Sequence, residues 1–321
     1  AMRPTPRLAS SSPSPIRAMH ANAPPGAVSL GLGEPTWDLH ELALDAMASM
    51  KGPCRYGPNS GLPSLSEAIA DRYARKGEDV LLGAGSQAVL FSLFLAWTGP
   101  GDSVLVPDPG FVSYPALARI SGASPVPYAL SPDGRLDAES FARAVNADGN
   151  AVMAIVNVPS NHKGGGCSGE TLAGIASICR ERGIILVSDE VYRELRLGSP
   201  QVSLRDASPD GIVVSSLSKA WGAPGLRVGW ATGAPEILAQ ARLVHNAMTS
   251  CVSMPAQLAA IALLEASEEV ISRSREELER RWEALVEAAA NYIGIRPQKP
   301  SGGFYWWLDL PPASGGDATS F

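Results

Sequence analysis

The stretch "IVVSSLSKAWGAPGLRVGW", residues 212–230, decides the fold class. It begins with an apolar run that ends in small hydroxyl residues, and then places a single lysine, Lys219, before a glycine-rich loop. A second apolar run follows Arg227. Short runs that are apolar throughout are typical of strands buried on both faces of a sheet. The stretch therefore predicts two strands, with a group of polar residues at the end of the first.

Similar apolar runs recur along the chain and alternate with longer segments of helical pattern. The predicted strands occupy residues 79–85, 103–110, 124–130, 151–158, 184–190, 211–218 and 226–232. The predicted helices occupy residues 86–97, 111–122, 137–146 and 168–183, and the chain is helical in pattern from 235 to 292. Apolar strands separated by helices require helices on both faces of the sheet. The fold class is therefore α/β, with a three-layer, mostly parallel sheet.

A chain of 321 residues is too long for one small core and predicts about two domains. We interpret residues 1–36 as an N-terminal arm and the start of a small domain, and residues 37–280 as a large domain. Residues 281–321 are interpreted as the beginning of a C-terminal small α+β domain, in which "SGGFYWWLDLP", residues 301–311, predicts a strand.

The composition excludes several classes of protein. The net charge is −6 and the pI is near 5.3, which disfavours binding to nucleic acid or to anionic membranes. No run of about 18 apolar residues is present, so no membrane-spanning helix is expected. The four cysteines, which are Cys54, Cys167, Cys179 and Cys251, are widely spaced and contain no Cys-x-x-Cys pair. This spacing favours reduced thiols, hence a cytoplasmic protein with no metal site.

Polar residues gather where the predicted strands end, which is where open α/β sheets bind ligands. Among them, Ser216, Ser218 and Arg227 offer hydroxyl and guanidinium donors suited to a phosphate, beside Lys219. A lysine that is partly desolvated and near other cations has a lowered pKa, and can attack an aldehyde. A phosphate beside a nucleophilic lysine indicates pyridoxal 5′-phosphate (PLP).

PLP also needs side chains that bind its ring and its phosphate, and residues at the ends of other predicted strands could supply them. Its ring nitrogen needs a buried carboxylate, for which Asp189 is the candidate, and its ring oxygen needs donors such as Tyr192 and Asn161. Phe111 could cover the ring, and a helix start at residues 85–87 could bind the phosphate. The residues of that helix start are Gly85, Ser86 and Gln87.

Each of these residues also has a purely structural interpretation. Lys219 could point to solvent, Asp189 could cap a helix or turn, and Phe111 could pack in the core. Asn161 lies in a glycine-rich loop that suits a turn, and Tyr56 could pack beside another turn. Their joint occurrence at successive strand ends favours the cofactor site.

With these residues in place, the sequence resembles the class I and II aminotransferases of the PLP fold-type-I superfamily, from about Leu30 to Leu310. "SLSKAWGAPGLRVGW" resembles the family's lysine signature, "SDEVY" its Asp-x-x-Tyr element, "GAGSQAV" its phosphate turn and "PDPGFVSY" its aromatic lid. The resemblance implies that Lys219 forms the Schiff base (aldimine) with PLP. It implies the same roles as above for Gly85, Ser86, Gln87, Phe111, Asn161, Asp189, Tyr192, Ser216, Ser218 and Arg227.

Two further segments carry implications about the partner subunit and the substrate. "YGPNSGLPSLSEAIA", residues 56–70, resembles the family segment whose tyrosine reaches the phosphate of the neighbouring subunit. This implies a homodimer in which Tyr56 serves the partner's site. "LGLGEPTWD" resembles the N-terminal substrate segment, which implies that Gly33, with Asn161, lies near the substrate carboxylate.

The sequence departs from the family pattern in two places. In "PSNHKGG", His162 and Lys163 replace the usual proline and small hydroxyl residue after Asn161. A cis Asn161–His162 bond would cost about 2.5–4 kcal/mol, so we expect a trans bond and a reshaped loop. The chain also ends at Phe321, and no residue can be assigned as the arginine that binds the substrate α-carboxylate in the family. We therefore expect that a C-terminal part of the small domain is missing.

The sequence therefore predicts an amino-acid aminotransferase that uses PLP, an amino acid and a 2-oxo acid. A PLP-dependent lyase or cyclase on the same scaffold, for example one that catalyses β-elimination from a cysteine conjugate, is the second hypothesis. A PLP-binding sensor domain and an α/β domain without PLP are the third and the fourth. The amino donor stays open. Four aromatic residues could shape an apolar pocket or simply pack in the core, namely Trp37, Tyr114, Trp221 and Trp306.

Overall fold

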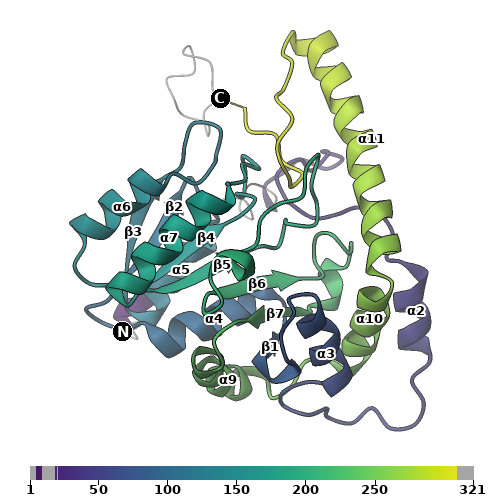
Figure 1. The fold of residues 1–321 in the computed structure, drawn as a ribbon. Coiled ribbons are helices and arrows are strands. Elements are labelled where there is room, and N and C mark those ends of the chain that lie inside the picture. Colours follow the sequence, from purple (N-terminus) through teal and green to yellow (C-terminus); the bar gives the residue numbers. More distant parts are fainter. Residues whose placement is uncertain (1–4, 9–18, 20, 309–321) are drawn as a thin grey trace, which may run out of the picture.

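The computed structural model describes residues 5–8, 19 and 21–308. These residues form one seven-stranded sheet with helices packed around it (Figure 1). The strand order is β1-β7-β6-β5-β4-β2-β3. Strand β7 runs antiparallel to both of its neighbours, and the other paired strands are parallel, which confirms the mostly parallel sheet. The strands are β1 (Val80–Gly83), β2 (Ser103–Asp108), β3 (Ser124–Ala129), β4 (Ala151–Asn157), β5 (Ile185–Asp189), β6 (Ile212–Ser216) and β7 (Gly229–Thr232).

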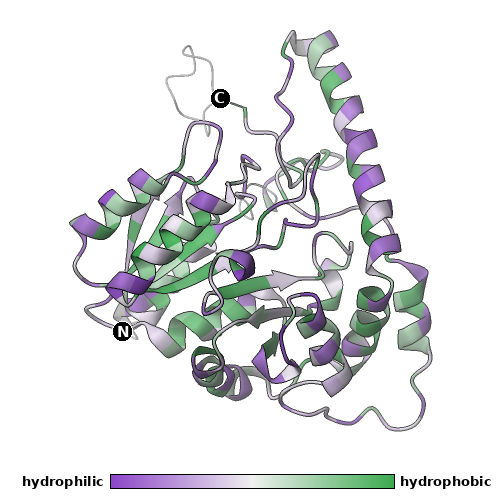
Figure 2. Cartoon of the chain, viewed as in Figure 1, coloured by the Kyte–Doolittle hydropathy of each residue, from purple (hydrophilic) through white to green (hydrophobic). Residues whose placement is uncertain are grey.

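Helices cover both faces of the sheet, as the apolar strands require. Strands β4, β5, β6 and β7 are coloured as strongly hydrophobic in Figure 2, and most of their residues are buried. One face packs against α4 (Ser86–Trp97), α5 (Ser113–Ser121) and α9 (Pro235–Thr249). The other face packs against α3 (Pro63–Asp71), α6 (Ala138–Ala147), α7 (Gly169–Arg182) and α8 (Leu204–Ala207). Helices α2 (Glu41–Ala48) and α10 (Met254–Glu265) extend this second layer.

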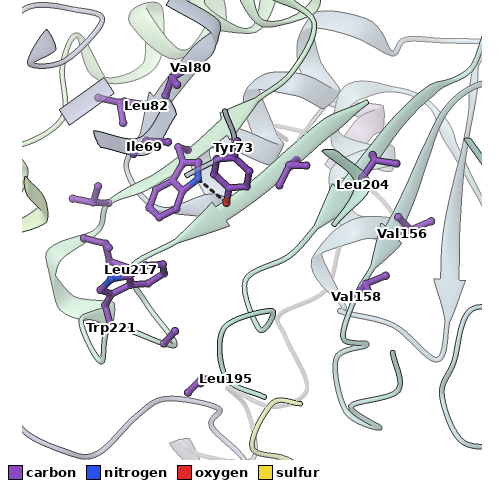
Figure 3. Close-up of a cluster of buried hydrophobic side chains, with 14 of the residues drawn as sticks. Ile69, Tyr73, Val80, Leu82, Val156, Val158, Leu195, Leu204, Leu217 and Trp221 are labelled. Atoms are coloured by element: carbon purple, nitrogen blue, oxygen red, sulfur yellow. Dashed lines mark hydrogen bonds between the residues drawn. The ribbon is translucent and has the colours of Figure 1, made fainter. Parts of the chain in front are cut away.

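The larger buried cluster lies on the second face and joins helices to strand ends. Figure 3 shows part of it, including Ile69 and Tyr73 beside Leu82. The Tyr73 hydroxyl accepts a hydrogen bond from Trp230 Nε1 at 3.3 Å, so two large polar aromatics are buried with a partner. Trp221, just after Lys219, is anchored in the same cluster. The core therefore fixes both sides of the lysine loop.

Three segments differ from the sequence prediction. Strand β7 begins at Gly229 rather than at 226, because residues 224–226 form a 3-10 turn and Arg227 takes a left-handed backbone with φ of 55°. Helix α5 begins at Ser113 rather than at 111. Residues 301–308 form no strand: Gly302 makes one isolated bridge to Arg196, and residues 309–311 lie outside the described part. Residues 195–197 lie antiparallel alongside residues 301–303 and share two backbone hydrogen bonds with them, but the pairing does not extend into a ladder.

Helix α11 (Ser267–Ile293) leads away from the sheet, and the segment that follows it returns towards the sheet (Figure 1). It runs unbroken through residue 280, so the domain boundary expected there stays a prediction. Glu194 ties its first half to the sheet layer by accepting hydrogen bonds from Arg275 at 2.9 Å and Arg72 at 3.0 Å. The segment after α11 is held by backbone hydrogen bonds instead, from Ser301 N to Gly164 O at 3.0 Å and from Gly303 N to Leu195 O at 2.8 Å.

No helix within residues 5–8, 19 and 21–308 combines the length and the hydropathy needed to cross a membrane. All four cysteines belong to this part of the chain and are free thiols.

Glu190 makes the stability of the fold depend on pH. Its carboxyl is fully buried and accepts a hydrogen bond from Leu204 N at 2.8 Å, and burial raises its pKa from 4.5 to about 7. The folded chain therefore binds more protons than the unfolded chain between these two values, so stability falls as pH rises through this window. The shift corresponds to roughly 3 kcal/mol.

We expect Glu190→Gln to remove this dependence, since glutamine keeps the acceptor for Leu204 N without a charge. Urea unfolding at pH 4.5 and pH 7.5 should show the variant gaining stability relative to the parent chain at the higher pH. The same stability difference at both pH values would contradict the assignment.

Candidate active site

A cavity of about 460 Å³ opens at the carboxyl ends of β4, β5 and β6. Parallel strands direct their carboxyl ends to one edge of a sheet, so residues far apart in the sequence meet there. The predicted site residues that line this cavity are Gly33, Ser86, Gln87, Phe111, Asn161, Asp189, Tyr192, Ser216, Ser218, Lys219 and Arg227.

Lys219 enters the cavity from the turn that follows β6. Its Nζ donates to the carbonyl oxygen of Gly33 at 2.5 Å and lies 5.7 Å from the ring centroid of Tyr192 and 5.3 Å from that of Phe304. Burial lowers the pKa of this amine from 10.5 to about 8, although Asp189 opposes the shift. A lysine with such a pKa is neutral in a substantial fraction near pH 8, as a nucleophile requires.

Asp189, the last residue of β5, lines the cavity and is only 3% exposed. Its Oδ2 accepts a hydrogen bond from the Tyr114 hydroxyl at 2.8 Å, and its Oδ1 accepts one from Val191 N at 3.3 Å. Burial raises its pKa from 3.8 to about 6, while these hydrogen bonds and Lys219 act against the shift. Asp189 is therefore a fixed acidic group that a cationic ligand would stabilise in its charged form.

Asn161 and Tyr192 form a pair on the cavity wall. Asn161 Nδ2 donates to the Tyr192 hydroxyl at 3.0 Å. The Asn161–His162 bond is trans, which confirms the expectation from the missing proline, and His162 takes a φ of 76°. Asn157 fixes this loop, because its Oδ1 accepts from Asn161 N at 2.6 Å and its Nδ2 donates to the Asp189 carbonyl at 2.8 Å. The reshaped loop thus still directs Asn161 into the cavity.

Arg227 lies beside the N-terminus of α4. Its Nη2 donates to Ala84 O at 3.3 Å and its Nη1 to Pro224 O at 3.0 Å. A Cβ added at Gly85 would clash with the Arg227 guanidinium, which would have to move away from the N-terminus of α4. No side chain caps α4, which leaves its first backbone N–H groups directed at the cavity. We call this pair the candidate anion site, because a guanidinium beside a helix N-terminus has the chemistry to bind an anion.

The remaining predicted residues differ in their placement. Phe111 lines the cavity and packs edge-on against Tyr114 with ring centroids 5.6 Å apart. A Cβ at Gly33 would overlap the Tyr305 hydroxyl, so this glycine permits a close approach of the C-terminal segment. Tyr56 is 92% exposed and does not line the cavity of its own chain. Its role in a partner's site stays a prediction.

Several cavity residues were not singled out for this site from the sequence. Tyr114, for which core packing was considered, holds Asp189, and Asn157 holds the Asn161 loop. Glu34 and Tyr305 also line the cavity. Asn157 and Glu34 carried a signal, since Asn157 lies near the end of the predicted strand 151–158 and Glu34 follows Gly33. Tyr305 carried none, because its position depends on how the chain returns from α11.

The comparisons with known proteins agree with this geometry. The family model for aminotransferase class I and II matches residues 25–321. The chain belongs to the class I and II aminotransferases. This aminotransferase is 32% identical over 299 residues to the aspartate/prephenate aminotransferase of Thermus thermophilus, covering 89% of this chain and 77% of that protein. It is 30% identical over 294 residues to the aspartate aminotransferase of Geobacillus stearothermophilus, covering 87% and 74%.

The fold agrees with a solved structure of the same family. The aspartate aminotransferase of Thermus thermophilus with maleate superposes with a TM-score of 0.90 at 30% identity, covering 97% of this chain and 86% of that one. The fold is therefore that of the PLP fold-type-I enzymes, and this aminotransferase is PLP-dependent.

The residues present fit PLP. The cofactor carries a phosphate, an aldehyde, a ring oxygen and a ring nitrogen that must stay protonated. The cavity presents one group of matching chemistry for each: the candidate anion site at Arg227, the amine of Lys219, the Asn161–Tyr192 pair and the buried carboxylate of Asp189. The space that glycine leaves at residue 85 admits the guanidinium that such a phosphate would need.

Proposed function

We propose that this aminotransferase moves an amino group from an amino acid to a 2-oxo acid through Lys219. The observation that carries the proposal is that Lys219 and Asp189 line one cavity, where the carboxylate raises the pKa of an amine that burial lowers. Two such groups can flank one cofactor ring. Because similar proteins are named aspartate aminotransferases, aspartate is the first donor to test.

PLP supplies an aldehyde that condenses with amines and a protonated ring that accepts electron density from the substrate Cα. Lys219 Nζ acts as the nucleophile, and, once displaced, takes the proton from the substrate Cα as a general base. Its lowered pKa keeps part of the amine neutral for both roles. Gly33 O accepts a hydrogen bond from this amine at 2.5 Å and orients it.

The other residues bind and orient the cofactor. Asp189 would hold the ring nitrogen with its proton, and Tyr192 and Asn161 would donate to the ring oxygen. Phe111 would cover one ring face and exclude water from it. The residues that would hold the phosphate are Gly85, Ser86, Gln87, Ser216, Ser218 and Arg227. The substrate carboxylate would lie near Gly33 and Asn161.

The proposal extends to three further features, which are the oligomeric state, the location in the cell and the division into domains. A homodimer, with Tyr56 serving the partner's phosphate site, is supported by the 92% exposure of that aromatic side chain. A cytoplasmic location is supported by the four free cysteines. A large domain at residues 37–280, with small-domain segments at 1–36 and 281–321, is supported by the way α11 leads away from the sheet (Figure 1).

The test is incubation of the PLP-loaded protein with aspartate and other amino donors, with and without 2-oxoglutarate or pyruvate. Aminotransfer predicts a new amino acid and a new 2-oxo acid, formed only when both substrates are present. Pyruvate and ammonia released from a cysteine conjugate without an acceptor would indicate the lyase instead. No reaction with any donor would contradict the proposal.

Gly85→Ala tests the candidate anion site. A methyl group at this position has to displace the Arg227 guanidinium, and Gly85 also has a φ of 83° that disfavours alanine. We expect PLP affinity to fall about tenfold to a hundredfold, since a charge-assisted hydrogen bond contributes about 1.5–3 kcal/mol.

Equilibrium dialysis with PLP and with pyridoxal, which lacks the phosphate, measures this effect. The control is Gly174→Ala, because a Cβ at Gly174 meets no atom within 4 Å. Equal losses for PLP and pyridoxal would show that the change acts on the fold rather than on the phosphate.

A further inference from the structure

We propose that a second cavity, next to the active site, binds the carboxylate at the far end of a substrate's side chain. This inference rests on the proposed function and names its substrate class. The cavity, called the tail cavity below, has a volume of about 250 Å³ and is lined by residues 132, 133, 135, 163–165, 298–301 and 305–307. Tyr305 lines both the tail cavity and the cavity that contains Lys219. The two cavities therefore share one wall residue, past which the side chain of a substrate beside Lys219 would extend.

The tail cavity has an excess of positive charge. Its lining contains the cations Arg135, Lys163 and Lys299 against one carboxylate, Asp133. Arg135 pairs with Asp133 at 2.9 Å, and Lys299 pairs with Glu279. Within residues 5–8, 19 and 21–308, Lys163 has no carboxylate at salt-bridge distance. One cation of the lining thus remains to attract an anion.

Lys163 is held in place by groups that do not neutralise it. Its Nζ donates to Pro132 O at 2.9 Å and lies 5.1 Å from the ring centroid of Trp307. A carbonyl and an indole face position an ammonium without cancelling its charge. Because an ammonium has three donors, two remain after the bond to Pro132, and a carboxylate can accept them.

The loop that carries Lys163 is fixed before any ligand arrives. Gly164 O accepts hydrogen bonds from Ser301 N at 3.0 Å and Gly302 N at 3.2 Å. On the other side, Gly165 N donates to Ser160 Oγ at 3.0 Å, and Ser160 N donates to Gly165 O at 2.8 Å. A preorganised loop lowers the entropy that ligand binding would otherwise lose.

An aromatic wall lies where the two cavities meet: Tyr305 lines both, Trp307 lines the tail cavity, and His162, which lines neither, packs against these two rings. The ring of His162 lies 5.8 Å from that of Tyr305 and 5.9 Å from that of Trp307, between centroids. Burial lowers the pKa of His162, so its ring is neutral at pH 7 and the charge at this wall comes from Lys163. Methylene groups of a substrate tail would contact the rings of Tyr305 and Trp307, and its terminal carboxylate would reach Lys163. The substrate class is an amino acid or 2-oxo acid with a terminal carboxylate on a chain longer than that of aspartate.

Calorimetry on the PLP-loaded full chain tests this with non-reacting ligands, so no turnover is needed. We expect adipate, which has two carboxylates, to bind about tenfold more tightly than hexanoate, which has one. Lys163→Met should bring the two affinities within about twofold of each other, and Lys163→Arg should restore the preference. Lys299→Met is the matched control, since Lys299 lines the same cavity but is already paired, and its effect should be smaller.

Equal affinities for adipate and hexanoate in the parent chain would overturn the proposal. So would an adipate preference that survives in Lys163→Met. If acetate binds without competing with hexanoate and Lys163→Met abolishes that binding, the cavity takes a free carboxylate rather than a substrate tail. An adipate preference in a chain that transfers no amino group would refute the proposed function and leave the carboxylate site standing.

Discussion

Lys219→Ala is expected to lower the rate of amino transfer by at least about a thousandfold, because one side chain serves as both nucleophile and proton carrier. Lys219 is directed into the cavity by its hydrogen bond to Gly33 O, and burial lowers its pKa to about 8. Within residues 5–8, 19 and 21–308, no other lysine lines this cavity, so no second amine can replace it there. The rate is measured with aspartate and 2-oxoglutarate.

A spectrum separates loss of chemistry from loss of fold. The variant should lose the visible absorption band that depends on the covalent bond between the lysine and PLP, while its unfolding midpoint in urea stays close to that of the parent. Lys51→Ala is the control, because Lys51 is exposed and lies far from the lysine loop in the sequence. Retention of the rate within tenfold in Lys219→Ala would refute the assigned role.

The sheet and its helices could be predicted because each strand satisfies a local rule. Strands such as 151–157 are apolar on both faces, which only a covered parallel sheet allows. Segment 301–311 satisfied the same local rule, yet residues 301–308 form no strand. A strand needs a neighbour to pair its backbone groups, and the sequence pattern of one segment does not reveal that neighbour.

The residues of the site also divide into those with a local sequence signal and those that are placed only by packing. Lys219, Asp189 and Arg227 could be predicted, because each ends a strand or lies in a motif whose spacing carries its chemistry. Tyr114 could not, since an aromatic side chain on a helix is most often core, and only the packing of α5 against the sheet brings its hydroxyl to Asp189. Tyr305 required the return of the chain after α11, which has no local signal.

Asp189→Asn is expected to lower the rate by about a hundredfold to a thousandfold, the usual effect of losing one preorganised electrostatic partner in a buried site. Asparagine preserves the shape: its one oxygen can still accept from Val191 N, and its amide nitrogen can donate to the Tyr114 hydroxyl. It carries no negative charge to hold a proton on the ring nitrogen. The rate is measured under the same conditions as for Lys219→Ala. Glu190→Gln is a matched control, because it removes a buried carboxylate one residue away that does not line the cavity.

A second readout follows from the coupling between the two groups. The charge of Asp189 raises the pKa of Lys219, so its removal should move that pKa further below 8. In the cofactor-free protein, the rate at which an amine-selective reagent modifies Lys219, located by mass spectrometry, should reach its midpoint at a lower pH in Asp189→Asn. In Glu190→Gln the midpoint should stay where it is in the parent chain. A midpoint that rises in Asp189→Asn, or that moves equally in both variants, would mean that the Asp189 charge does not act on Lys219, and would contradict the observation that carries the proposed function.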